Sequence, residues 1–301
     1  MESVYDITLL TEPRYYRPKN LTPYIQDVLQ EDQLVEDALR QLGFKTIRIP
    51  WSEESFDWAS TKFALFRTTW DYFDRFDVFK PWLDQVSQMT QLINDSALIY
   101  WNFDKHYLQD LHVKGVSVIP THYVYARNSE KLSEIVTNLG WQDIIIKPTI
   151  SGTAKDTHLI PYAVIEQHNP LFESLKTRQD MMIQPVQEFI LTTGEYSLIV
   201  IDGMYSHAVL KVAKPGDFRV QNDFGGTVHP YNPTREEIDF ALAVTGQCDP
   251  QPIYARVDMI RKNDGDLALV ELELIEPELW LRHRPQAAAN LATAIKRFVH
   301  K

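Results

Sequence analysis

The sequence predicts an α/β protein built from three lobes, with a mostly parallel sheet in the first and antiparallel strands in the last. Strands alternate with helices over the N-terminal third, which is typical of a parallel sheet. Two Asp-Gly pairs in the C-terminal part each lie between two apolar runs, a pattern that predicts β-hairpins. We expect the lobes to span residues 1–118, 119–187 and 188–301.

In the N-terminal lobe, a helix is predicted to end at Gly43, because the apolar residues before it recur at helical spacing. A Trp- and Phe-rich helix is expected over about residues 78–93. The expected strands are residues 4–10, 44–49, 63–67 and 97–101.

The central lobe is predicted to be a small α/β unit, and the C-terminal lobe to contain two hairpins. The central elements are a short helix leading in at 105–114, helices near 129–139 and 163–177, and strands at 143–148 and 181–186. The C-terminal elements are hairpins at 195–212 and 254–276 and helices at 234–246 and 285–299.

The composition is that of a globular protein and excludes several functional classes. Of 301 residues, 44% are hydrophobic and 12% aromatic, enough for a sizeable core. The net charge of −11 argues against binding nucleic acid or an anionic membrane surface. Cys248 is the only cysteine, so no disulfide framework is expected. The chain shows no signal-peptide pattern and no bilayer-length apolar run, so a soluble, cytoplasmic protein is the simplest expectation.

The hairpin at 254–276 carries acidic residues in an unusual arrangement. A two-residue turn at Asp264-Gly265 would place Asp258 directly opposite Glu271, with Glu273 on the same face. Like charges across a ladder repel, and a hard divalent cation such as Mg²⁺ would remove that cost. A solvated charged face is the alternative, and the hairpin alone does not decide between the two.

Lysines next to small-residue loops indicate an anion site in this acidic protein. Lys147 ends a run of three isoleucines, and the loop after it, around Ser151 and Gly152, offers backbone N–H groups to an anion. The Walker spacing is absent, and an ordinary surface turn is the alternative for this loop. Lys105 lies at the start of a short helix, where a surface lysine would need no function.

A second group of cations lies after the first C-terminal hairpin. Lys211, Lys214 and Arg219 fall within nine residues, which suggests a local anion site or a solvated basic run. The following Gly225-Gly226 pair suggests a backbone that approaches a ligand closely or turns sharply.

The end of the predicted strand at 63–67 is a candidate substrate site, because ligands bind outside the carboxyl ends of strands in open α/β sheets. Arg67 is there a candidate anchor for a substrate carboxylate, with Asp71 beside it. An Arg–Asp ion pair that braces an aromatic turn is an equally good interpretation.

Taken in order, these segments resemble ATP-grasp enzymes of the glutathione synthetase and ribosomal-S6-modification ligase type, over roughly residues 100–300. The patterns RTTWDY, WNFDKHYL and ELELIEP also resemble the O-ureido-serine cyclo-ligase group of D-cycloserine biosynthesis. The matching segments are Asp104-Lys105, Ile146-Lys147-Pro148, Ser151-Gly152, Ile183-Gln184-Pro185, Gly194-Glu195, Lys211, Gly216-Asp217-Phe218-Arg219, Gly225-Gly226, Arg256-Val257-Asp258 and Glu271-Leu272-Glu273.

The resemblance implies an ATP-grasp fold with a Rossmann-like N-terminal lobe, a small central lid lobe and a C-terminal antiparallel-sheet lobe. It implies ATP and one or two Mg²⁺ ions, with Mn²⁺ as an alternative metal. The implied roles are phosphate binding by Lys105, Lys147, Ser151 and Gly152, an adenine hinge at Gln184, Pro185, Val186 and Gln187, ribose binding by Glu195, γ-phosphate and acyl-phosphate binding by Lys211 and Arg219, and metal binding by Asp258, Glu271 and Glu273.

Three features depart from the family pattern or leave it open. The family commonly has asparagine where Glu273 stands, and both hinge glutamines fit the adenine position. A strict two-residue turn at Asp202-Gly203 would put Glu195 and Lys211 on opposite faces of the hairpin. Either a β-bulge lies between them, or one of the two roles is wrong.

The expected function is an ATP- and Mg²⁺-dependent ligase. It would activate a small, amino-acid-like carboxylate as an acyl-phosphate, which an amine or other nitrogen nucleophile then attacks. The substrate carboxylate is expected near Arg219 and Arg67, facing Gly225-Gly226. The alternatives are an intramolecular cyclo-ligase, a small-molecule phosphotransferase and a non-catalytic nucleotide-binding module. The expected partners are small molecules and, as in related ligases, further copies of the chain in a dimer or tetramer.

Overall fold

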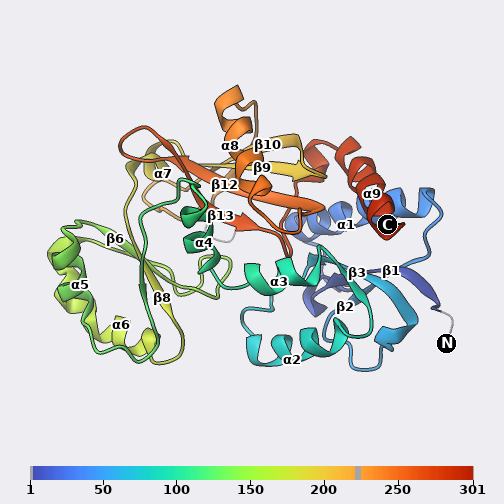
Figure 1. Ribbon diagram of the computed structural model, residues 1–301, viewed down its shortest axis with the longest axis horizontal. Coiled ribbons are helices and arrows are strands. Elements are labelled where there is room, and N and C mark those ends of the chain that lie inside the picture. Colours follow the sequence, from blue (N-terminus) through green and yellow to red (C-terminus); the bar gives the residue numbers. More distant parts are fainter. Residues whose placement is uncertain (1–2, 221–224, 301) are drawn as a thin grey trace.

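The computed structural model describes residues 3–220 and 225–300, which form three sheets in succession along the chain (Figure 1). The first sheet has the order β2-β1-β3-β4 and all its pairings are parallel, as predicted. Its strands are β1 (Tyr5–Thr11), β2 (Thr46–Pro50), β3 (Thr61–Thr68) and β4 (Gln91–Ile93), and its helices are α1 (Pro23–Gln41) and α2 (Phe76–Val86).

The carboxyl ends of β1 and β3 lie side by side, because Thr11 is the register partner of Thr68. Their side-chain hydroxyls are hydrogen-bonded at 2.6 Å. The segment after β1, which forms the short helix η1 (Pro13–Tyr15), therefore lies beside the segment after β3. These two segments build the N-terminal wall of the site described below.

The predicted strand at 97–101 is wrong, because these residues form helix α3 (Ser96–Asn102). The Asp95 side chain accepts a hydrogen bond from the backbone N–H of Ala97 at 2.8 Å and so caps the helix. The fourth strand is β4, inside the span predicted as helix, and α2 already ends at Val86. A short apolar run fits a helix and a strand equally well, and here the cap decides.

The central sheet is antiparallel, with the order β5-β8-β6-β7. Two helical segments, α5 and α6, cover one face of it, and both lie beside it in Figure 1. The elements of this part are α4 (Tyr107–Val113), β5 (His122–Val124), α5 (Leu132–Leu139), β6 (Ile144–Pro148), β7 (His158–Ile160), η3 (Tyr162–His168), α6 (Asn169–Lys176) and β8 (Met181–Pro185).

The third sheet is antiparallel, with the order β11-β10-β9-β12-β13. The β9–β10 register shifts between Tyr205 and His207, so Glu195 lies directly opposite Lys211. Of the two alternatives stated for Glu195 and Lys211, the β-bulge between them is therefore the one that the structure shows. The elements of this part are α7 (Glu188–Thr192), β9 (Glu195–Ile201), β10 (Met204–Val212), β11 (Thr227–Tyr231), α8 (Arg235–Gly246), β12 (Tyr254–Arg261), β13 (Leu267–Glu273), η5 (Leu281–His283) and α9 (Gln286–Val299).

The turn predicted at Asp264-Gly265 is wrong, although the pairing of the acidic residues is right. Lys262 donates its backbone N–H to Asp266, which closes a three-residue loop with Gly265 at φ 93°. A register shift after Asp258 then compensates for the extra loop residue, so that Asp258 still lies opposite Glu271. At this shift Val270 packs beside Ile119.

The C-terminal helix α9 returns to the first sheet and packs against α1, as Figure 1 shows. Leu291 and Ile295 of α9 share one buried cluster with Val35 and Leu39 of α1. The two ends of the described chain are thus held in one core. Within residues 3–220 and 225–300, no helix is both long and apolar enough to cross a bilayer.

Candidate active site

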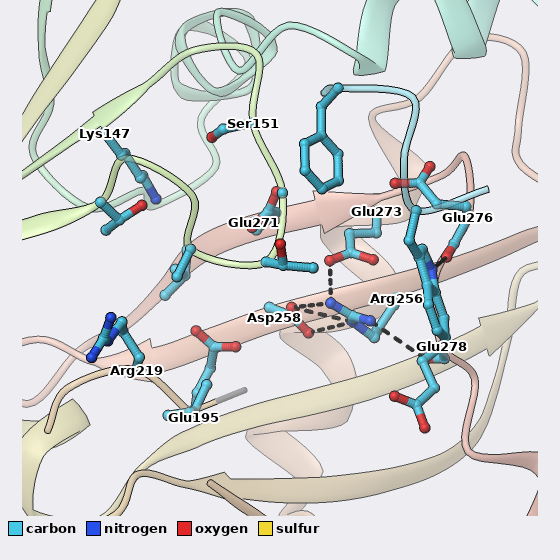
Figure 2. Close-up of a pocket in the computed structure, with 18 of the residues that line it drawn as sticks. Lys147, Ser151, Glu195, Arg219, Arg256, Asp258, Glu271, Glu273, Glu276 and Glu278 are labelled. Carbon is cyan, nitrogen blue, oxygen red and sulfur yellow. Dashed lines mark hydrogen bonds and ion pairs between the residues drawn. The ribbon is translucent and has the colours of Figure 1, made fainter. Parts of the chain in front are cut away.

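A single cleft of about 580 Å³ is lined by residues from all three sheets. Its size lies in the usual range for small-molecule sites. Figure 2 shows Lys147 and Ser151 on one wall and Asp258, Glu271 and Glu273 on the strands of the third sheet. Most residues predicted for the site line this cleft, namely Asp71, Lys105, Lys147, Ser151, Gly152, Gln184, Pro185, Gln187, Glu195, Lys211, Arg219, Asp258, Glu271 and Glu273.

Four predicted site residues do not line the cleft. Val186 lies in the hinge, but its backbone N–H is bonded to the carbonyl of Asp143 at 2.9 Å. Gly225, at φ 83°, and Gly226 lie outside the lining, while residues 221–224 before them are outside the described part. Arg67 is only 1% exposed and lies 3.4 Å from Asp32 of α1, so it is part of the N-terminal core and does not line the cleft.

Lys211 is held between two carboxylates inside the cleft. Its ammonium group forms ion pairs with Glu195 on β9 and, at 2.9 Å, with Asp258 on β12. Burial alone would lower the pKa of Lys211, but the charge of Asp258 and then that of Glu195 outweigh it and raise the pKa. Lys211 is therefore a permanently charged group, suited to bind an anion such as a phosphate.

Arg256 also lines the cleft, although the sequence analysis gave it no role of its own. Its guanidinium group donates to Asp258 at 2.9 and 3.0 Å and also pairs with Glu273, as the dashed lines in Figure 2 show. The indole ring of Trp280 lies beneath it at 5.1 Å. Burial alone would raise the pKa of Asp258, but the charges of Arg256 and then Lys211 hold it below its ordinary value.

The acidic hairpin is fixed to the N-terminal lobe through its backbone. The side chain of Asn102 donates to the carbonyl of Leu272 at 2.8 Å and accepts from the N–H of Leu274 at 2.9 Å. These two bonds flank Glu273 and fix the direction of its side chain. Asn94 likewise bonds the carbonyls of Tyr254 and Leu274, each at 2.9 Å.

Lys105 and Lys147 face the hairpin from the other wall of the cleft. The ammonium group of Lys105 lies 3.2 Å from Glu271 and also donates to the carbonyl of Ser151. Burial alone would raise the pKa of Glu271, but Lys105 and then Lys147 lower it. Burial is also the main cause that lowers the pKa of Lys147. Two cations thus converge where phosphate oxygens are expected.

The oxygen donors of the cleft fit Mg²⁺ that arrives with a nucleotide. In the described part of the chain, no three His, Cys, Asp or Glu side chains converge closely enough to hold an ion by themselves. Asp258, Glu271 and Glu273 are each paired with a cation instead. Mg²⁺ is commonly held by one or two carboxylates together with substrate phosphates, and the facing pair Asp258 and Glu271 supplies that number. Glu273 stays a prediction as a metal ligand, and burial raises its pKa to about 7.

The two hinge glutamines differ in their bonding. Gln184 donates its side-chain amide to Thr121 at 2.8 Å, whereas the side chain of Gln187 joins the hinge to the β12–β13 loop by accepting from Asn263 at 3.0 Å. Both line the cleft beside Pro185. The choice between them as the adenine contact stays open.

The loop after Lys147 closes the cleft against the N-terminal lobe. A side-chain carbon added at Gly152 would lie 2.4 Å from the ring of Phe73, so only glycine fits beneath that ring. Lys155 of the same loop forms an ion pair with Asp74. Residues that follow β3 thus hold the loop after Lys147 in place.

Comparison with known proteins shows the family to which the chain belongs. Residues 108–279, more than half of the chain, match the RimK-like ATP-grasp domain. The chain belongs to this family. ATP-grasp ligases form carbon–nitrogen bonds, release ADP and use ATP and Mg²⁺. In this RimK-like chain, residues 7–94 also match the N-terminal domain of the D-cycloserine synthetase DcsG.

Individual relatives support the same assignment. The cycloserine biosynthesis protein DcsG of Streptomyces lavendulae is 29% identical over 278 residues, which cover 86% of this chain and 90% of the relative. The crystal structure of D-cycloserine synthetase DcsG superimposes with a TM-score of 0.84 at 26% identity, over 97% of this chain and 98% of that chain. The D-alanine–D-alanine ligase of Bacillus anthracis shares the fold, with a TM-score of 0.62 at 13% identity over 97% and 96% of the two chains.

Proposed function

We propose that this chain is an ATP- and Mg²⁺-dependent ligase that activates a small, amino-acid-like carboxylate as an acyl-phosphate and joins it to a nitrogen nucleophile. The observation that carries the proposal is that lysine side chains lie opposite carboxylates in one cleft. Lys105, Lys147 and Lys211 surround the pair Asp258 and Glu271, with ion pairs to that pair at 2.9 and 3.2 Å.

In the first step, an oxygen of the substrate carboxylate attacks the γ-phosphorus of ATP, and ADP leaves. Carboxylate and triphosphate are both anionic, so the repulsion between them is the main obstacle that the protein has to remove. Lys105 and Lys147 would neutralise the phosphates, and Lys211 and Arg219 would neutralise the transferred group. Mg²⁺ held by Asp258 and Glu271 would supply further positive charge to the phosphate oxygens.

In the second step, the nitrogen attacks the acyl carbon, inorganic phosphate leaves and the nitrogen loses a proton. The acyl carbon passes through a tetrahedral state with a negative oxygen. Arg256 lines the cleft with its guanidinium group against Asp258 and is a candidate donor to that oxygen. Arg219 is pre-ordered for anion binding because Asp217 holds its guanidinium group by two bonds, of 3.0 and 2.7 Å.

A trapping assay tests the activation step without knowledge of the natural nucleophile. The purified protein is incubated with ATP, Mg²⁺, hydroxylamine and a panel of amino acids, and ADP and hydroxamate are measured. We expect both products to appear together for at least one carboxylate. Stoichiometric ADP release without hydroxamate, or a stable phosphorylated product, would contradict acyl-phosphate formation and favour the phosphotransferase.

Variants of the hairpin test the assigned ligands. Asp258→Asn and Glu271→Gln should abolish turnover, whereas Asp266→Asn, on the exposed loop of the same hairpin, should leave it unchanged. Normal turnover in both cleft variants would overturn the metal assignment. Tight ATP binding without turnover across the whole panel would favour a nucleotide-binding module.

Intramolecular cyclisation is a second candidate, and a specific observation favours it. The match to DcsG extends through the N-terminal domain, the part expected to contact the substrate. The site would be the same, with the nitrogen nucleophile supplied by the activated molecule itself. Mass spectrometry distinguishes the two reactions, because condensation gives a product heavier than the carboxylate substrate.

A further inference from the structure

The N-terminal end of the cleft contains a carboxylate that neither the fold nor the proposed catalytic steps use. Glu12 directly follows β1, lines the cleft and is 6% exposed. Its backbone N–H is bonded to the carbonyl of Thr68 at 2.8 Å, which fixes the residue beside the segment that follows β3. Among residues 3–220 and 225–300, its carboxylate has no hydrogen-bond or ion-pair partner. A buried acid without a partner is costly and therefore calls for a ligand that supplies one.

The charged neighbours of Glu12 are all engaged elsewhere. Asp71 accepts from the indole N–H of Trp51 at 2.6 Å and pairs with Arg75 at 3.1 Å. Asp74 pairs with Lys155 of the loop after Lys147. The guanidinium group of Arg14, the nearest cation on the same segment, lies over the ring of Tyr15 at 5.2 Å. Among the described residues no cation pairs with Glu12, and the charge of Arg14 lowers its pKa less than burial and Asp71 raise it.

Aromatic rings form the wall beside Glu12. The rings of Tyr15 and Trp70 meet edge to face at 5.4 Å, and Tyr24 stacks on Trp70 at 6.5 Å. All three line the cleft. The indole N–H of Trp70 donates to the carbonyl of Glu276 at 2.8 Å, which joins this wall to the segment after β13. A carboxylate beside aromatic faces is a typical environment for an ammonium group.

The two ends of the cleft carry opposite charges. In Figure 2, Lys147 and Arg219 lie at one end, and Glu276 and Glu278 lie at the other, beyond Arg256. Burial, followed by repulsion from Glu273, raises the pKa of Glu276 well above its ordinary value. Phosphates therefore fit the first end, and a cation fits the second.

We infer that Glu12, with the aromatic wall of Tyr15, Tyr24 and Trp70, binds a protonated amino group of the substrate whose carboxylate is activated. This inference rests on the proposed function and specifies its substrate class as an amino acid that keeps its ammonium group throughout the reaction. The amino group bound at Glu12 is not the nucleophile, because a protonated nitrogen has no lone pair with which to attack.

Matched pairs of compounds test the inference. The probes are the D- and L-α-amino acids, each paired with the 2-hydroxy acid of the same side chain, in the hydroxylamine trapping assay with ATP and Mg²⁺. We expect the amino acid to exceed its hydroxy acid in kcat/KM by on the order of 10- to 100-fold, the range of a lost charge-assisted hydrogen bond.

The Glu12→Gln variant should raise the KM for the amino acid by a similar factor and change kcat little. Its kcat/KM for the hydroxy acid should stay within about threefold of the parent protein, since the hydroxy acid has no ammonium group and no ion pair is lost in that complex. Glu12→Asp should restore part of the preference for the amino acid. Glu54→Gln, an exposed acid of the same lobe, should behave like the parent protein.

Equal use of the two compounds in a pair, or an unchanged preference in Glu12→Gln, would overturn the inference and leave the proposed function intact. A loss confined to kcat would overturn it as well, because that result would mark Glu12 as a proton acceptor. The absence of ATP-dependent turnover with every compound would refute the proposed function and this inference together.

Discussion

Glu12→Gln is expected to stabilise the ligand-free protein at high pH and to leave its stability at low pH almost unchanged. Burial, with a further contribution from the charge of Asp71, raises the pKa of Glu12 from 4.5 to about 7 in the folded protein, against an opposing effect of Arg14. In the unfolded chain the carboxyl group has its ordinary pKa. Between pH 4.5 and about pH 7, the folded protein therefore keeps a proton on Glu12 that the unfolded chain has already lost.

The sign follows from this difference. Below pH 4.5 both states are protonated and Glu12 costs no stability, whereas above pH 7 both are ionised and the full cost of the buried charge is present. Stability is therefore lost as the pH rises between these values. The full difference corresponds to about 3 kcal/mol, and because Glu12 lines the cleft and is not fully buried we expect about 1–3 kcal/mol. Glutamine has nearly the same shape and no charge, so it removes this cost.

Urea-induced unfolding at pH 5 and pH 8, followed by tryptophan fluorescence, measures the effect. The free energy of unfolding of Glu12→Gln, relative to the parent protein, should be higher at pH 8 than at pH 5 by about 1–3 kcal/mol. Glu54→Gln controls for a change of net charge, and the other carboxyl groups titrate alike in all three proteins. An equal difference between variant and parent at both pH values would refute the assigned environment of Glu12.

Three further predictions concern other parts of the cleft and the core. Gly152→Ala should raise the KM for ATP severalfold, because its added carbon would lie 2.4 Å from the Phe73 ring; adding Phe73→Ala should restore the KM. Lys211→Met should lower the free energy of unfolding in urea by about 3–5 kcal/mol, because Glu195 loses its cation. Adding Glu195→Gln should recover much of this loss. An equal loss in the double variant would contradict the pairing. Burial raises the pKa of Cys248 to about 11, so a thiol reagent at pH 8 should label the native protein far more slowly than the urea-unfolded chain, and equal rates would contradict this burial.

The acidic hairpin of the candidate site could be predicted from the sequence because it depends on strand register. Side chains alternate along a strand, so the facing of Asp258 and Glu271 follows once the hairpin is recognised. The loop has three residues and not the predicted two, but the pairing of Asp258 with Glu271 is unchanged because a bulge compensates for the longer loop. A turn depends on a few backbone angles, whereas the burial of a whole apolar face fixes the register.

The part of the cleft that we propose to bind the substrate could not be predicted in the same way. The rule that ligands bind beyond the carboxyl ends of strands pointed to Arg67, the last charged residue of β3. The same rule applied to β1 points to Glu12, but the sequence does not show which of the charged residues at a strand end finds a partner. Arg67 has Asp32 of α1 beside it, at a separation that only the folded chain defines, and Glu12 has none among the described residues.

The measurement that tests the central claim most directly is carboxylate-dependent formation of ADP and hydroxamate in the presence of ATP, Mg²⁺ and hydroxylamine. We predict equal amounts of the two products with at least one amino acid and with the parent protein. We also predict loss of both in Asp258→Asn and their retention in Asp266→Asn. ADP release that needs no carboxylate, or hydroxamate formation that survives in Asp258→Asn, would contradict the account.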